Sequence, residues 1–295
     1  MSQRQVGVAY ALTAYGIWGV LPLYLKALHP VPPLEIVAHR IVWAALLLAL
    51  VLGATKQWGW LRQLRGQPRV VWTFMATATA LSVNWLTYIW AVGTGRIVDA
   101  SLGYFINPLF SVVLAVLVLK ERLRVGQWAA VALAGIGVSW LTLQADQLPW
   151  IGLTLAVSFG FYGLLRKTAS IDALGGLTLE TWLLLPLALG YLAWLSLSGQ
   201  SSWAAEGWSE RSLLVAAGPI TALPLLAFAA GARRIPLSLL GILQYLGPTL
   251  QLALGVLVFH EPLPAAKLLG FVLIWAGLAV YTLEGLLVRQ RPALG

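Results

Sequence analysis

Three residues that could do chemistry stand close together at the head of a long apolar run, in the segment EIVAHRIVW: Glu35, His39 and Arg40. A carboxylate, an imidazole and a guanidinium can move protons or bind charged groups. On a helix, Glu35 and His39 are one turn apart and face each other, whereas Arg40 points about 140° away from Glu35 at 3.6 residues per turn. Arg40 therefore needs a partner from elsewhere.

Three interpretations of Arg40 are open. Its long side chain could snorkel to the periplasmic face, it could pair with another helix through Glu261 or Tyr104, or it could contact an anionic ligand or a gate. An arginine at the centre of a bilayer costs about 2.5–3.5 kcal/mol on insertion scales, so it is seldom there without a reason. His39 is the one intramembrane group that titrates near neutral pH, which makes it the candidate for any proton coupling.

Pro108 and Pro248 lie in the interior of apolar runs, at positions 140 residues apart that match in the two halves of the chain. A proline has no N–H to donate, so the carbonyls of Tyr104 and Gln244 should lose their usual helical partners. The pair predicts kinks that either act as hinges or are static. Polar side chains gather around these kinks and along a nearby run, where they predict either a cavity for a small amphipathic or aromatic molecule or ordinary interhelical hydrogen bonds. They are Asn84, Tyr88, Tyr104, Asn107, Gln244, Tyr245 and Gln251.

Four glutamates recur in related positions, Glu35 with Glu180 and Glu121 with Glu261. Their repetition near the ends of apolar runs predicts end anchors or gate salt bridges. The chain has no Cys, only three His, and no G-x-x-x-x-G-K-[ST] sequence. We therefore expect no metal site, no cofactor, no ATP hydrolysis and no enzymatic activity.

The composition indicates the class of protein structure that positions these residues. Hydrophobic residues make up 60% of the 295-residue chain and charged residues 10%, against about 25% charged in soluble domains. Many runs reach the roughly 20 residues that cross a bilayer. We predict an all-α polytopic membrane protein with ten spans, near residues 7–26, 34–53, 70–93, 99–119, 125–144, 149–166, 175–197, 211–232, 237–259 and 264–287.

The loops predict the orientation. Of the 19 Lys and Arg residues, 14 fall on the side of the N-terminus, four on the other side, and Arg40 within a span. The positive-inside rule then places both termini in the cytoplasm. The same bias accounts for the basic pI of about 10.1 without a nucleic-acid partner.

The chain also repeats itself. A shift of 140 residues aligns NPLFSVVLAVLVLKERL with GPTLQLALGVLVFHEPL, which matches Pro108 with Pro248 and, further along, Gly137 with Gly277. We predict two five-helix repeats, 7–144 and 149–287. Because five is odd, the second repeat is inverted in the membrane, as in many secondary transporters. Arg40 has no counterpart in the second repeat, where Leu185 takes its place.

Several stretches resemble the EamA family of the drug/metabolite transporter superfamily, and most closely its RarD branch. They are LEIVAHRIVW, NWLTYIWAV, ASLGYFINPLFSV, LKERLR, GLTLETWLLLPLAL, QYLGPTLQ and VFHEPL. They run from the second predicted span to the ninth. The resemblance implies a ten-helix permease with two inverted repeats and a central cavity, and it implies no particular substrate.

We therefore expect an inner-membrane secondary transporter that moves a small organic metabolite or drug by alternating access. The alternatives are a channel or a non-transporting membrane scaffold, and, further off, an intramembrane enzyme. The expected partners are the lipid bilayer and a small molecule, with a homodimer left open.

Overall fold

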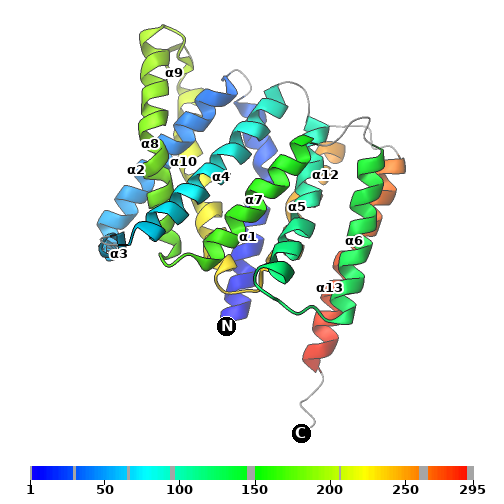
Figure 1. The fold of residues 1–295 in the computed structure, drawn as a ribbon. Coiled ribbons are helices and arrows are strands. Elements are labelled where there is room, and N and C mark those ends of the chain that lie inside the picture. Colours follow the sequence, from blue (N-terminus) through cyan, green and yellow to red (C-terminus); the bar gives the residue numbers. More distant parts are fainter. Residues whose placement is uncertain are drawn as a thin grey trace.

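The computed structural model describes residues 2–28, 31–64, 67–93, 97–144, 150–205, 207–258 and 265–290. Throughout these residues the regular structure is helical, which confirms the predicted all-α class. The long helices run side by side (Figure 1). In chain order the helices are α1 (Gln3–Ala27), α2 (Pro33–Thr55), α3 (Trp60–Leu64), α4 (Pro68–Gly93), α5 (Ile97–Leu117), α6 (Val125–Leu143), α7 (Trp150–Thr168), α8 (Ala173–Leu197), α9 (Ser202–Ala205), α10 (Trp208–Ala232), α11 (Leu237–Leu243), α12 (Leu246–Leu257) and α13 (Ala265–Gln290).

Each predicted span overlaps a long helix, except the ninth, which corresponds to α11 and α12 together. Within the described part of the chain, six segments are long and apolar enough to cross a membrane by length and composition. Two of the others, Gly103–Leu117 and Leu268–Glu284, are shorter apolar stretches of helix. The short helices α3 and α9 lie in connections and were not expected from the sequence, because neither has the length of a span.

The break between α11 and α12 falls at Gln244 and Tyr245, and it corrects the expected effect of Pro248. Pro248 is the third residue of α12, in the first turn, where a backbone N–H has no hydrogen-bond partner within the helix. The carbonyl of Gln244 is not left free, since it accepts the Gly247 N–H at 3.1 Å. Pro108, by contrast, lies inside the continuous helix α5. The two prolines therefore act differently on their helices.

The contacts between helices are symmetric with respect to a first half of the chain, α1 to α6, and a second half, α7 to α13. If α1, α2, α4, α5 and α6 are matched in order with α7, α8, α10, α11–α12 and α13, then contacts across the halves come in equivalent pairs. The contact of α1 with α10 corresponds to that of α7 with α4, and α1 with α12 to α7 with α5. The contacts α2 with α8, α5 with α11 and α6 with α13 join equivalent helices directly.

The contact between α6 and α13 shows this symmetry at the level of single residues. A Cβ on Gly137 would meet the carbonyl of Gly270 at 2.7 Å, and one on Gly277 would meet the carbonyl of Ala130 at 2.7 Å. Gly137 and Gly277 are the glycines that the 140-residue shift aligns. Small residues at these points let the two backbones touch, as is common between helices in membranes.

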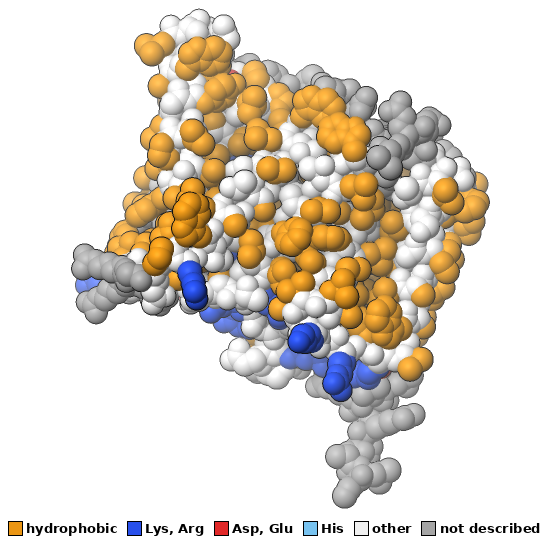
Figure 2. Space-filling view, viewed as in Figure 1, with side chains coloured by type: hydrophobic (Ala, Val, Ile, Leu, Met, Phe, Trp, Pro, Cys, Tyr) orange, Lys and Arg blue, Asp and Glu red, His pale blue; other side chains and the backbone are white. Residues whose placement is uncertain are grey.

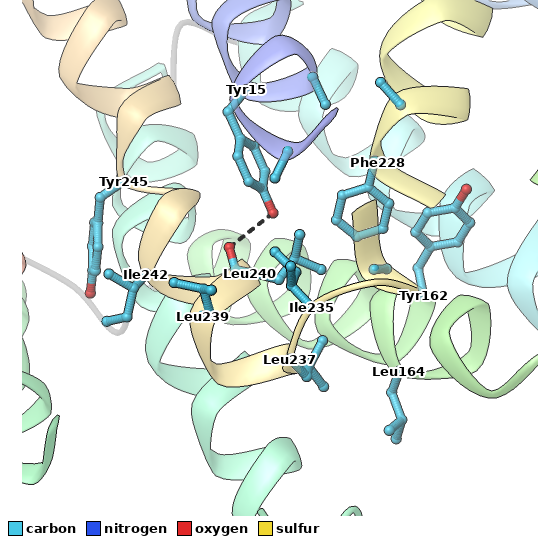
Figure 3. Packing of buried hydrophobic residues seen from close by; sticks show 14 of the residues in the cluster. Tyr15, Tyr162, Leu164, Phe228, Ile235, Leu237, Leu239, Leu240, Ile242 and Tyr245 are labelled. Atoms are coloured by element: carbon cyan, nitrogen blue, oxygen red, sulfur yellow. Dashed lines mark hydrogen bonds between the residues drawn. The ribbon is translucent and has the colours of Figure 1, made fainter. Parts of the chain in front are cut away.

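The core between the halves is rich in aromatic rings (Figure 3). Phe228 of α10 lies between Tyr15 of α1 and Tyr162 of α7, with ring centroids 6.3 and 5.7 Å away. The Tyr15 hydroxyl donates a hydrogen bond to the carbonyl of Leu240, 3.2 Å away, in α11. This bond ties the first helix of the chain to the segment just before the helix break.

The surface divides into an apolar wall and a basic edge. On the face shown in Figure 2, hydrophobic side chains spread over the height of the helices, and the visible Lys and Arg side chains gather along the lower edge. Both ends of the chain point toward that same edge in Figure 1. Exposed side chains such as Trp72 (67%) and Leu187 (73%) would be costly in water and suit contact with lipid.

Candidate functional site

Arg40 lies inside the protein, with 7% of its surface exposed. Helix α2 begins at Pro33, and its residues 35–41 are all buried, so this part of the helix carries the side chain into the bundle. The Nε of Arg40 donates a hydrogen bond to the Thr221 Oγ1 of α10 at 2.8 Å. Its guanidinium carbon lies 4.7 Å from the ring centroid of Trp85 in α4, a cation–π contact. These contacts exclude snorkelling from the three interpretations of Arg40.

Three tyrosines lie within electrostatic reach of the Arg40 guanidinium: Tyr24, Tyr88 and Tyr104. The rings of Tyr88 and Tyr104 meet edge to face, 5.7 Å apart. The structure thus brings the predicted residues Tyr88 and Tyr104 to Arg40. Among the described residues, no carboxylate lies within 4.0 Å of the Arg40 guanidinium.

A small pocket of about 10 Å³ lies beside Arg40, which is space for about one water molecule. Two helices from each half line it: α2 and α4 from the first, α8 and α10 from the second. Under the matching of the halves, α2 corresponds to α8 and α4 to α10, so the pocket lies between equivalent helices. Its lining residues are Arg40, Ile41, Ala44, Leu81, Trp85, Leu177, Glu180, Thr181, Leu184, Thr221, Ala222 and Leu225.

Glu180 faces this pocket and belongs to a buried ion pair that the sequence reasoning missed. Its Oε1 lies 3.6 Å from Nη1 of Arg166, and both side chains are 1% exposed. The other carboxylate oxygen accepts a hydrogen bond from the Tyr162 hydroxyl at 3.4 Å. Arg166 also donates to the Ala173 carbonyl at 3.0 Å, and a side chain at Gly176 would collide with its Nη1.

The sequence analysis counted Arg166 among the 14 basic residues on the side of the N-terminus, at the end of the predicted span 149–166. A usable signal was its distance from Glu180, which is 14 residues further along the chain. The two residues flank the short connection between α7 and α8. A short connection keeps the end of one helix near the start of the next, so a long arginine side chain there can reach a residue of the second helix.

Glu35 and His39 lie apart from the pocket, at the start of α2. The Oε1 of Glu35 accepts hydrogen bonds from the Ser201 hydroxyl at 3.2 Å and the Ser202 N–H at 2.9 Å, at the beginning of α9. The expected approach of His39 is present, with Nε2 at 3.9 Å from Glu35. The His39 ring stacks on Trp203 at 5.5 Å. This cluster holds α9 against α2.

Several of the other predicted polar residues make hydrogen bonds between or within helices. Asn84 of α4 donates to the Leu155 carbonyl at 3.0 Å and the Ser158 hydroxyl at 3.1 Å, both in α7. The Asn107 side chain accepts from Ser111 at 3.3 Å. The remaining bonds run from Tyr245 to the Phe105 carbonyl at 3.4 Å and from Gln251 to the Trp18 carbonyl at 3.1 Å. Gln244 is buried at the helix break.

Glu121 binds the start of α11. Its two carboxylate oxygens accept the Leu237 N–H at 2.8 Å, the Ser238 N–H at 3.2 Å and the Ser238 hydroxyl at 2.7 Å. A carboxylate at a helix N-terminus satisfies free N–H groups and interacts favourably with the helix dipole. Its repeat partner Glu261 lies outside the described residues.

A larger groove of about 590 Å³ lies between α1, α11 and α13, beside the start of α1. None of the residues predicted for the site lines it, and its lining includes Arg4, Gln5 and Tyr281. Within the described ranges, no group of three or more His, Asp or Glu side chains is placed to hold a metal ion.

The long apolar helices and the apolar outer wall are those of a multi-pass membrane protein. The family model of the EamA-like transporter family matches residues 5–143 and 149–283. The chain belongs to this family, which confirms the resemblance seen in its motifs.

Named relatives agree with this assignment. The chain is 49% identical to an uncharacterized transporter of Pseudomonas aeruginosa over 94% of its own length and 93% of the relative's. It is 45% identical to protein RarD of Streptomyces exfoliatus, covering 98% and 92% of the two chains, and 41% identical to protein RarD of Escherichia coli, covering 99% and 98%. A solved structure titled only as the crystal structure of a protein shares the fold, with a TM-score of 0.70 and 22% identity over 94% of this chain and 98% of that one.

Proposed function

We propose that this chain is a secondary transporter of the bacterial inner membrane, which moves a small organic metabolite or drug by alternating access between its two halves. The observation that carries the proposal is the pocket beside Arg40, which is lined by two helices from each half. A site between equivalent helices of two repeats can open to either side when the halves rock. At about 10 Å³ the pocket is too small for a metabolite, so α2 and α4 must separate from α8 and α10 for cargo to bind.

Inverted repeats are part of the proposal. Two observations support two equivalent halves: the helix contacts are symmetric between them, and one family model matches the chain twice. Each half holds five spans under the matching of the helices, and an odd number inverts the second half relative to the first. The basic edge shared with both termini supports a cytoplasmic location for the two chain ends (Figures 1 and 2).

Transport by a carrier can be distinguished from the alternatives with purified protein in liposomes. A carrier shows saturable uptake and counterflow, in which unlabelled cargo inside the vesicle drives labelled cargo inward. A channel shows conductance without counterflow, and a scaffold shows neither. One relative is named chloramphenicol-sensitive protein RarD, so chloramphenicol is a suitable first test molecule.

Alternating access itself can be tested by labelling, because the chain has no cysteine and every introduced thiol is unique. We expect a Thr181→Cys variant to react with a small membrane-impermeant maleimide added from either side of the membrane, since Thr181 lines the pocket. Ala156→Cys in α7, at a fully buried position away from the pocket, is the matched control and should stay unlabelled. Labelling of Thr181→Cys from one side only would contradict alternating access.

A further inference from the structure

Among the described residues, no carboxylate balances the charge of Arg40 by lying within 4.0 Å of its guanidinium. A guanidinium stays ionised in proteins and carries five N–H donors. Among the described residues, one of these donors is used, the Nε–H that binds Thr221. Burying a cation without an anion is expensive, so the site gains most from a ligand that supplies the missing negative charge.

The groups around Arg40 are polarisable or polar but neutral. The Trp85 ring and the Thr221 hydroxyl contact it, and Tyr24, Tyr104 and Tyr88 are within electrostatic reach. Such a shell makes a cation tolerable through cation–π and dipole interactions without neutralising it. A purely architectural arginine would be better served by a carboxylate, and this chain does build such a pair elsewhere, between Arg166 and Glu180.

The carboxylate that lines the pocket and the carboxylate on the same helix as Arg40 both have other partners. Glu180 lines the same pocket, but it is paired with Arg166 at 3.6 Å and accepts a hydrogen bond from Tyr162. Glu35 is on the same helix as Arg40 and accepts bonds from Ser201 and Ser202. With the Arg166–Glu180 pair neutral as a unit, the pocket carries the net positive charge of Arg40.

We propose that the cargo of this transporter is an organic anion, whose carboxylate binds the Arg40 guanidinium while its apolar body lies between the two halves. The inference rests on the proposed transport function and deepens it. The planar guanidinium fork matches the two oxygens of a carboxylate. Most of the other residues of the pocket wall are apolar, with Ile41, Leu81 and Leu225 among them, and suit an aliphatic or aromatic body.

The test compares molecules of equal shape and different charge. Purified protein is offered benzoate, phenylacetate and hexanoate, each with its amide and its amine, and binding is measured by the shift in thermal unfolding temperature. We expect the carboxylates to bind about 10- to 100-fold more tightly than their amides, as one or two hydrogen bonds to a charged group provide. Amines should not bind.

Three variants separate the role of Arg40 from a general effect. Arg40→Gln should abolish the preference for the carboxylate over the amide, and Arg40→Lys should keep a reduced preference, because it retains the charge and loses the fork. The control Arg122→Gln removes an exposed cation in the connection between α5 and α6 and should behave as the wild type. Variants are compared only if they elute as monodisperse protein.

The outcomes distinguish this inference from the proposed function. If amides or amines show counterflow and carboxylates do not, the anion inference is wrong and the transporter function stands. If carboxylates bind through Arg40 without counterflow of any molecule, the binding site stands and the transporter function is wrong. An Arg40→Gln protein that keeps the full carboxylate preference overturns the inference directly.

Discussion

Arg166 and Glu180 form an ion pair in the interior, with Nη1 and Oε1 at 3.6 Å and each side chain 1% exposed. The pair joins α7 to α8 across the short connection between them, and Phe74 of α4 lies under the guanidinium at 5.4 Å. Removing one member of a buried pair leaves the other charge without compensation. The pair therefore acts as a fixed structural element next to the pocket that Arg40 lines.

The first prediction concerns this pair. Glu180→Gln should lower the free energy of unfolding by about 3–5 kcal/mol, because the charge of Arg166 is then buried alone. The double variant Arg166→Gln/Glu180→Gln should be more stable than the sum of the two single variants indicates. Thermal or denaturant unfolding of the purified proteins measures all four. Additive effects of the two substitutions would mean that the side chains do not interact.

A second prediction concerns the contact between α6 and α13. Gly137→Ala and Gly277→Ala should each destabilise the protein by about 1–3 kcal/mol, since the added methyl group meets a backbone carbonyl that cannot move aside. Gly135→Ala is the matched control in the same helix. Nothing lies within 4 Å of its added Cβ, so this change should be neutral or stabilising by about 0.5–1 kcal/mol. Equal stability of all three variants would rule out close packing at the repeated glycines.

The third prediction concerns the connection before α6. Glu121→Ala should cost about 0.5–2 kcal/mol of stability, as the loss of a helix cap does. It frees the N–H groups of Leu237 and Ser238, and unfolding of the purified protein measures the loss. Glu121→Asp should recover part of the loss, because it keeps the carboxylate. If the alanine variant also changes the rate of counterflow at unchanged stability, Glu121 contributes to a gate as well as an anchor.

The fourth prediction separates the two prolines. Pro108→Ala restores an N–H inside α5 that can bind the Tyr104 carbonyl, so we expect a stiffer helix and slower counterflow. Pro248→Ala changes the first turn of α12, where no intrahelical bond is gained, and should leave counterflow near the wild-type rate. Normal counterflow in both variants would show that neither proline is a hinge.

The fifth prediction concerns orientation. A reporter fused after the C-terminus and active only in the cytoplasm should be active. The same reporter inserted at Gly199–Gln200, between α8 and α9, should be inactive, because that connection lies at the other end of α8 from the basic edge. The opposite pattern of activity would invert the proposed topology.

The course of the chain could be read from the sequence. Ten apolar runs predicted the long helices to within a few residues, since a backbone in hydrocarbon must satisfy its hydrogen bonds locally and a helix does so from consecutive residues. The glycine and proline matches at a shift of 140 residues could also be found from the sequence, because they depend only on the order of residues along the chain. The approach of Glu35 to His39 also followed from helical spacing.

Partners that come from distant residues could not be read in this way. The sequence showed that Arg40 needs a partner on another helix, and the tertiary structure selected Thr221, 181 residues away, and Trp85. It also placed Arg166 against Glu180 in the interior and moved the helix break from Pro248 to Gln244 and Tyr245. Helical periodicity says which face of a helix a side chain occupies, and only the packing of one helix on another decides what that face meets.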